Sequence, residues 1–244
     1  MFAPIEADVV VVGSGIAGAM AAFAAAAQGK RVAVLERGPV LSDAIASEVF
    51  RHNTFYGVES LPRVAVTKTG ADGTSNRFLP TVVGGLANFY QGVSLRMREA
   101  EFQRWPIAYA QLEPYYSHAE ELLGVAGMAG NDPYEPPRSR PYPHALPEPT
   151  EVGRRMIDAA QRTGVRAFPH PLAIRFDGGC QRCFYCNQVP CPVGVKFSPA
   201  RFLAQHTGLS VTVHPEHYVT QIVWREHGTS KRVDHLLVRA NRDS

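Results

Sequence analysis

The sequence predicts an α/β fold built on a Rossmann-like, dinucleotide-binding domain that is interrupted by a smaller inserted segment. Three observations predict this class: a glycine-rich turn near residue 13, a second apolar strand that ends in an acid, and alternating strands near residue 220. Two helical patterns and a proline-rich stretch lie between the second and third of these, which places them outside the parallel sheet.

The glycine-rich turn predicts a nucleotide pyrophosphate site. The apolar run Val9–Val12 leads into Gly13-x-Gly15-x-x-Gly18 and an Ala-rich helix over 16–27. Gly13 allows the tight turn, Gly15 lets the backbone approach the phosphates, and Gly18 lets the helix pack closely on the strand. The helix N-terminus then presents free N–H groups and a positive dipole end to the phosphates. A glycine turn without a ligand is the alternative.

A second apolar strand over 31–35 ends in Glu36. An acidic residue at that place can accept hydrogen bonds from both ribose hydroxyls of an adenosine. Because the strand, the turn and the acid occur together, the glycine motif carries more weight than it does alone.

Length and composition limit the classes of function. With 244 residues and 45% hydrophobic content, the chain can bury one or two domain cores. Its net charge of +3, with acids and bases interspersed, gives no basic stripe for nucleic acid. The apolar helix pattern over 16–27 is too short for a transmembrane segment, and no secretory leader precedes Asp8, so we expect a cytoplasmic protein.

The middle of the chain changes character several times. Residues 37–80 look irregular, and a double glycine at Gly84-Gly85 follows, where the backbone can approach a flat ligand. Helical spacing begins after Trp105-Pro106 and can end at Gly124, and a proline-rich connection covers 131–149. The apolar residues expected on this first helix are Leu112, Tyr115, Tyr116, Ala119, Leu122 and Leu123.

The last third predicts one helix, a cysteine loop, a helix start and a β region. The helix covers 151–163 with Val152, Met156, Ile157 and Ala160 facing inward, and another helix starts near Ser198-Pro199. Residues 209–213 and 218–224 alternate at period two, and 232–239 would pair with 218–224 across the polar turn 226–231.

Three motifs in one order resemble the glucose-methanol-choline (GMC) oxidoreductases, flavoenzymes that oxidise alcohols and sugars. The family's opening is similar to residues 9–38, and its second flavin loop is similar to Gly84-Gly85 through Arg96 with the Glu101-Phe102-x-x-Trp105-Pro106 run. The stretch 108–125 resembles the helix that leads into the family's substrate domain. The resemblance covers nearly the whole chain and implies an FAD-binding domain with an inserted, partial substrate or lid domain.

The resemblance implies a set of residues for FAD. The first turn would hold the pyrophosphate, the acid would bind the ribose, and the second loop would border the isoalloxazine ring. Members that resemble pyranose oxidase attach the flavin through a His, whereas the matching Phe89 has no nucleophile, which implies non-covalent FAD. The implied residues are Gly13, Ser14, Gly15, Gly18, Glu36, Arg37, Gly84, Gly85, Asn88, Phe89, Tyr90 and Val219.

The resemblance also implies that the family's catalytic residues lie in a C-terminal half that this chain does not match, so the catalytic residues are unknown here. Family members run to roughly twice this length, beyond a typical single domain. The unmatched half carries the strand that closes the FAD domain and the His with His or Asn pair that takes the substrate proton. We therefore expect a C-terminally truncated chain in which none of the nine histidines is the catalytic one.

All four cysteines lie in one loop, Cys180-x-x-Cys183-x-x-Cys186-x-x-x-x-Cys191-Pro192. Thiolates at these gaps can converge on one metal centre, and the spacing resembles a bacterial ferredoxin run without its last gap. Many family members have such a stretch without a metal, while dehydrogenase large subunits that pass electrons to a cytochrome carry an iron–sulfur cluster in a comparable place. We favour no metal, then a cluster, then zinc.

The expected function is FAD-dependent oxidation of the CH–OH group of an alcohol or sugar, with hydride transfer to flavin N5. The expected partners are a small alcohol or sugar and an electron-acceptor protein. The alternative is an inactive FAD-binding fragment that needs a missing C-terminal half, and an NAD enzyme is disfavoured because the Gly84-Gly85 loop has no role in it. The expected domains are 1–100 for FAD, 101–175 for the substrate or lid segment, and 176–244 for the return to the FAD domain.

Overall fold

The computed structural model describes residues 3–70, 73–130, 132–206 and 210–240. The chain divides into two compact units, which are described separately below. Unit 1 comprises 1–90, 187–190 and 198–244, and unit 2 comprises 91–186 and 191–197. The first boundary therefore follows Tyr90 rather than residue 100, and most of the cysteine loop belongs to unit 2.

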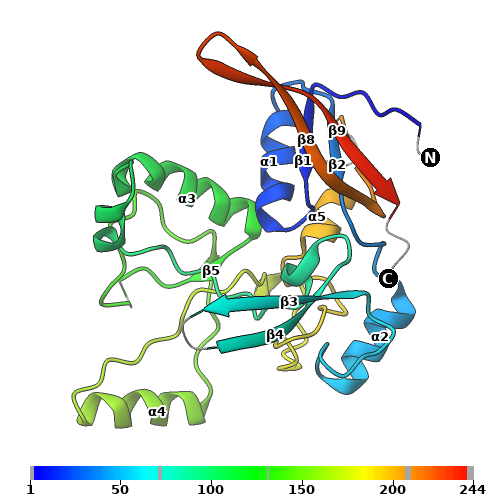
Figure 1. The fold of residues 1–244 in the computed structure, drawn as a ribbon. Helices are drawn as coiled ribbons and strands as arrows, with labels where there is room; N and C mark the ends of the chain where they lie inside the picture. Colours follow the sequence, from blue (N-terminus) through cyan, green and yellow to red (C-terminus); the bar gives the residue numbers. More distant parts are fainter. Residues whose placement is uncertain (1–2, 71–72, 131, 207–209, 241–244) are drawn as a thin grey trace. The chain divides into compact units, whose positions relative to one another are not determined.

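The parallel sheet of unit 1 has the order β1-β2-β7. It consists of β1 (Val9–Val12), β2 (Val32–Leu35) and β7 (Val211–His214), and β2 is buried at every position because it lies in the middle. Helix α1 (Ile16–Ala26) lies against β1 and β2, as Figure 1 shows, and its buried residues are Ala19, Ala22 and Ala26. The Rossmann-like start predicted from the sequence is therefore confirmed.

A second helix covers α1 in the same unit. Helix α5 (Pro199–Gln205) begins after Ser198, whose Oγ accepts a hydrogen bond from the N–H of Arg201 at 3.4 Å. The ring of Phe202 meets the ring of Phe23 edge to face, with centroids 5.4 Å apart. The predicted helix start at Ser198-Pro199 is thus correct, and this helix is fastened to α1 by aromatic contact.

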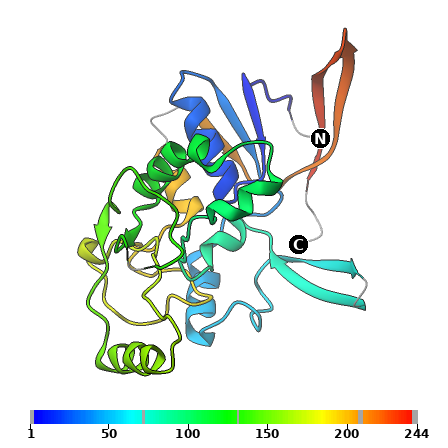
Figure 2. The same cartoon turned by 90° about the vertical axis from the view of Figure 1, so that its left-hand side faces the viewer.

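The prediction of an irregular segment over 37–80 is wrong. This part forms α2 (Asp43–His52) and an antiparallel hairpin of β3 (Arg63–Gly70) and β4 (Gly73–Pro80), which extends to one side in Figure 2. Ser42 caps α2 because its Oγ accepts from the N–H of Ile45. The segment packs around a core of Val49, Phe55, Val58, Leu61, Val82, Phe89 and Val189.

The predicted C-terminal hairpin is confirmed. Strand β8 (His217–His227) pairs antiparallel with β9 (Ser230–Ala240), and the register joins His217 to Ala240. Much of its apolar surface is exposed, with Ile222 at 52% and Val233 at 55%. It faces the sheet of unit 1 across an open depression of about 1410 Å³ lined by both.

Unit 2 contains α3 (Tyr109–Leu123), α4 (Glu151–Arg162), the short strands β5 (Ala126–Gly127) and β6 (His144–Ala145), and long irregular connections. Gly124 ends α3 in the left-handed conformation at φ +62°, as predicted. The predicted apolar faces of the two helices are partly wrong. Tyr115 is 70% exposed and Met156 is 67% exposed, whereas α3 buries Ser117 and Glu120.

Candidate functional site

The three glycines of the turn in unit 1 differ in how strictly the fold requires them. A Cβ on Gly18 would lie 2.0 Å from the carbonyl oxygen of Gly13, so only glycine fits where α1 crosses the turn. Gly13 has φ +91°, which favours glycine for conformational reasons. Gly15 has an ordinary φ of −61°, and a Cβ there would meet nothing within 4 Å. The fold therefore requires Gly13 and Gly18, and leaves open space beside Gly15.

The N-terminus of α1 is suited to an anion. Its N-cap is Gly15, which provides no side chain to cap the first N–H groups, and the first turn contains no acidic residue. Free N–H groups and the positive end of the helix dipole attract phosphate oxygens. The turn therefore fits the pyrophosphate predicted from the sequence.

Glu36, at the end of β2, is 8% exposed and bonded on both carboxyl oxygens. Its Oε2 accepts from the N–H of Ser14 at 2.8 Å and from the Oγ–H of Ser14 at 2.5 Å, and its Oε1 accepts from the N–H of Gly38 at 3.0 Å. The Ser14 hydroxyl accepts in turn from the N–H of Gly84 at 2.8 Å. We call these four residues, Ser14, Glu36, Gly38 and Gly84, the Ser14 cluster.

Arg37 presents an unsatisfied donor beside the same acid. Its guanidinium lies over the ring of Tyr218, 4.6 Å from the centroid. Its Nε is buried and has no hydrogen-bond partner among the described residues. A buried donor without a partner costs free energy, so this nitrogen is suited to a ligand acceptor. Val219, the predicted adenine contact, follows Tyr218 on β8.

The second glycine loop is held by side chains inside unit 1. Gly84 has φ +88°, and a Cβ there would lie 2.4 Å from Asn88 Oδ1. Asn88 donates from Nδ2 to the carbonyl of Val83 at 2.8 Å, and its Oδ1 accepts from the Oγ–H of Ser198 at 2.8 Å. Asn88 therefore acts from within the loop, as a brace for the turn at Gly84 and Gly85. Sequence reasoning used Ser198 only as a helix start and missed this contact.

The next two residues of the loop differ from the simple expectation. The ring of Phe89 is 1% exposed and packs in the core against Phe55, with centroids 5.3 Å apart. Any contact of Phe89 with a bound flavin would thus come from its backbone. Tyr90, which is half-buried, closes unit 1 at its first boundary.

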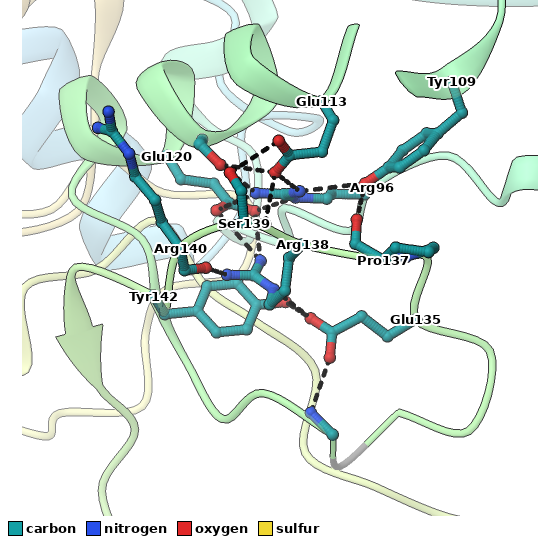
Figure 3. Close-up of polar contacts among 12 residues, drawn as sticks. Arg96, Tyr109, Glu113, Glu120, Glu135, Pro137, Arg138, Ser139, Arg140 and Tyr142 are labelled. Atoms are coloured by element: carbon teal, nitrogen blue, oxygen red, sulfur yellow. Dashed lines mark hydrogen bonds and ion pairs between the residues drawn. The ribbon is translucent and has the colours of Figure 1, made fainter. Parts of the chain in front are cut away.

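Unit 2 holds a different polar centre, the Arg96 network, which Figure 3 shows. Arg96 donates to both oxygens of Glu120 at 2.8 Å, to Glu113 at 3.0 Å and to the hydroxyl of Ser117 at 3.0 Å. Its side chain is only 2% exposed. The carboxyl groups come from α3, and the face that this helix buries against Arg96 carries Glu113, Ser117 and Glu120, none of which was among its predicted apolar residues.

The Arg96 network continues into the proline-rich segment. Arg138 donates to Glu120 and Glu135 at 2.8 Å, and its guanidinium lies 3.6 Å from the centroid of the Tyr142 ring. The backbone N–H of Ser139 donates to Glu113 and, with the Arg96 guanidinium, holds the pKa of that carboxyl near 2. The segment 135–142 is therefore fastened to α3 by charges rather than by apolar packing. The network consists of Arg96, Tyr109, Glu113, Ser117, Glu120, Glu135, Arg138, Ser139 and Tyr142.

The cysteine loop lies in unit 2 with one buried lysine beside it. Cys183 is exposed, whereas Cys180, Cys186 and Cys191 are half-buried, and all four are free thiols. Burial raises the pKa of the Cys186 thiol and lowers the pKa of Lys196 to about 8. Lys196 Nζ donates to the carbonyl of Cys186 at 3.0 Å. Within the described ranges, no three His, Cys, Asp or Glu side chains are grouped closely enough to hold a metal ion.

The length and apolar character of the described helices decide whether any of them could cross a membrane. None of them combines the length and the apolar character that crossing a bilayer requires. The longest, α3, carries glutamates and histidine along its length.

Comparisons with known proteins agree with the site. Residues 8–48 match the family described as FAD binding domain, a range that contains the glycine turn, Glu36 and Arg37. The chain is 33% identical over 209 residues to the 6'''-hydroxyparomomycin C oxidase of Streptomyces lividus and 31% identical to the paromamine 6'-oxidase of Streptomyces fradiae. Each match covers 78% of this chain and 36% of the relative.

Two further comparisons concern the family and the fold. An uncharacterized GMC-type oxidoreductase of Mycobacterium tuberculosis is 30% identical, over 79% of this chain and 28% of the relative. The crystal structure of pyridoxine 4-oxidase from Mesorbium loti superposes with a TM-score of 0.62 at 17% identity, covering 97% of this chain and 47% of that one, which supports the fold alone. The chain thus spans about a third of the length of its curated relatives, and it belongs to the glucose-methanol-choline oxidoreductase family of FAD-binding proteins.

Proposed function

We propose that this protein contributes the FAD-binding part of an oxidoreductase that oxidises the CH–OH group of an alcohol or sugar. The proposal extends from the family to an activity, because the chain spans only 36% of the first relatives. FAD, when bound, supplies the acceptor at N5 for the hydride that leaves the carbinol carbon.

The observation that carries the proposal is the pairing of the glycine turn with Glu36. The N–H groups at the start of α1 bind phosphate oxygens, and the open space at Gly15 admits the pyrophosphate. A carboxylate offers about four acceptor positions, and Glu36 already uses three of them. About one position is left for a ribose hydroxyl, fewer than the two expected from the sequence.

Other residues of unit 1 complete the proposed site. Arg37 Nε donates to an acceptor on the adenosine side of the cofactor, because this donor has no protein partner among the described residues. Gly84 and Gly85, braced by Asn88, allow the backbone to approach the flat ring. The cofactor is held without a covalent bond, since Phe89, Tyr90 and their neighbours in the loop offer no histidine.

The proposed substrate class is a small molecule with an oxidisable hydroxyl. One relative is named for a hydroxyparomomycin and another for oxidation at the 6' position of paromamine, which favours an alcohol or sugar here. The proton of that hydroxyl needs a base, which we assign to no residue of this chain. An electron-acceptor protein is the second proposed partner, and we assign no iron–sulfur cluster to the four cysteines.

A second candidate function is a catalytically inactive FAD-binding fragment that needs a missing C-terminal half. The observation that favours it is the short share of each relative that the chain covers. Alcohol-dependent reduction of a dye by the chain alone supports the enzyme. Dye reduction that begins only after the family's C-terminal half is added supports the fragment.

The experiment on FAD binding uses Gly15→Val. The structure has open space beside this residue and an ordinary backbone there, so the variant should fold and yet block the pyrophosphate. The purified wild type should show a flavin spectrum and release its flavin on acid precipitation, and the variant should show none. Gly57→Val, at another glycine with open space, is the control and should retain FAD. Wild-type FAD content in Gly15→Val, or flavin in the acid pellet, contradicts the proposal.

A further inference from the structure

The hydroxyl of Ser14 joins three segments that are far apart in the sequence. Ser14 is fully buried between β1 and α1, and its partners Glu36 and Gly84 lie 22 and 70 residues away. All three residues belong to unit 1. One side chain therefore connects the end of β2 to the second glycine loop.

The hydrogen count fixes the direction of this connection. A serine hydroxyl has one proton to donate and two lone pairs to accept with. The proton is directed at Glu36 Oε2, 2.5 Å away, and the N–H of Gly84 occupies one lone pair at 2.8 Å. The backbone N–H of Ser14 is also directed at Glu36. Neither donor of Ser14 is therefore free for a phosphate oxygen, which needs donors and supplies none.

The loop at the other end of the connection has little freedom of its own. A side chain at Gly84 would collide with Asn88, and Asn88 is fixed by Val83 and by Ser198. The hydrogen bond that the Gly84 N–H donates to Ser14 Oγ therefore adds to a loop that Asn88 already braces.

We propose that Ser14 is a positioning residue, whose buried hydroxyl holds the Glu36 carboxyl at the ribose and the Gly84 turn at the flavin in one arrangement. This role differs from direct binding of the pyrophosphate, which the sequence predicts for Ser14. The inference rests on the proposed FAD site, and it adds that one hydroxyl sets both ends of that site.

The test compares ADP with 2'-deoxy-ADP, which keeps the diphosphate and lacks one ribose hydroxyl. In isothermal titration of the purified protein without FAD, the wild type should bind ADP about threefold to tenfold more tightly than 2'-deoxy-ADP, as one hydrogen bond allows. Ser14→Ala should bring the ratio close to one, mainly by weakening ADP. Ser14→Thr keeps the hydroxyl and should restore most of the ratio.

Two results would overturn the inference. A serine that touches the diphosphate directly would, when replaced by alanine, weaken both nucleotides equally and leave the ratio unchanged. A wild-type ratio of one would show that Glu36 does not sense the ribose. Failure of the wild type to bind FAD or ADP at all would instead remove the proposed function, so the two failures can be told apart.

A second readout examines the flavin end. In the FAD-bound protein, Ser14→Ala should change the position or the vibronic shape of the visible flavin band, and Ser14→Thr should resemble the wild type. If Ser14→Ala does not fold by circular dichroism, Ser14→Cys replaces it, because a thiol leaves no cavity and donates only weakly. An unchanged nucleotide ratio together with an unchanged flavin band in that variant contradicts the positioning role.

Discussion

The two units bury an acid in opposite ways. Glu36 of unit 1 is 8% exposed and receives its hydrogen bonds from neutral groups, namely two backbone N–H groups and one hydroxyl. Glu120 of unit 2 is 5% exposed and is held between two arginines, Arg96 and Arg138. Neutral donors do not cancel the negative charge of Glu36, so that charge is available to a ligand. The two guanidinium groups already balance the charge of Glu120.

This difference indicates that the Ser14 cluster is arranged for binding and the Arg96 network for structure. A buried charge that is fully paired costs much when one partner is removed, because the other charges remain in the interior. A carboxyl held by neutral donors costs less to alter, but its loss changes what the site recognises. Substitutions in the two clusters should therefore separate stability from ligand binding.

The largest effect is expected at Arg96. Arg96→Met leaves Glu113 and Glu120 short of a buried counter-charge, and should lower the free energy of unfolding by about 3–5 kcal/mol. Urea unfolding measures the change. Arg140→Met, which removes an exposed pair with Glu121, is the matched control and should cost less than about 1 kcal/mol. Equal effects of the two substitutions would contradict a structural role for the network.

A smaller effect is expected at Glu36. In Glu36→Gln, the amide NH₂ replaces one acceptor and faces a donor from Ser14 or Gly38, at a cost of about 1–3 kcal/mol. The loss should appear as weaker FAD binding measured by flavin fluorescence. Glu48→Gln removes a similar pair with Ser60 at the surface and is the control. Unchanged FAD affinity in Glu36→Gln would show that this acid does not bind the cofactor.

The stability of the Arg96 network can also be tested by lowering the pH, without removing Arg96. The pKa of Glu113 falls from 4.5 to about 2 in the folded protein, first through the Ser139 N–H. Because the folded pKa is depressed, this stabilisation is complete above pH 4.5 and is lost as the pH falls towards 2. Urea midpoints across this range should fall less steeply in Glu113→Gln than in the wild type. Parallel slopes would count against the Glu113 contribution.

The smallest effect is expected at the cysteine loop. Cys186→Ser should leave FAD binding and urea stability within about 0.5 kcal/mol of the wild type, as for substitutions away from critical contacts. Protein purified without oxygen should contain well under one iron per chain. Stoichiometric iron and acid-labile sulfide that disappear in Cys186→Ser would show that the loop holds a cluster.

Local patterns predicted the start of the FAD domain and the C-terminal hairpin, because glycine spacing and alternation act over a few residues. They missed α2 and the β3–β4 hairpin, where a short capped helix and a turn interrupt any long periodic run. The buried face of α3 was also missed, since the polar side chains of Ser117 and Glu120 are paired there with Arg96, which lies outside the helix. The Ser14 connection spans 70 residues, so no local spacing could have predicted it.

The pairing of β2 with β7 also affects the order in which the chain can fold. Val32 pairs with Val211, so the central strand of unit 1 gains its second neighbour only after most of the chain has been synthesised. Arg96 and Glu120 are separated by 24 residues, so unit 2 can form its main contacts much earlier. We expect unit 1 to expose the β2 edge during synthesis, which makes it the unit that depends most on chaperones.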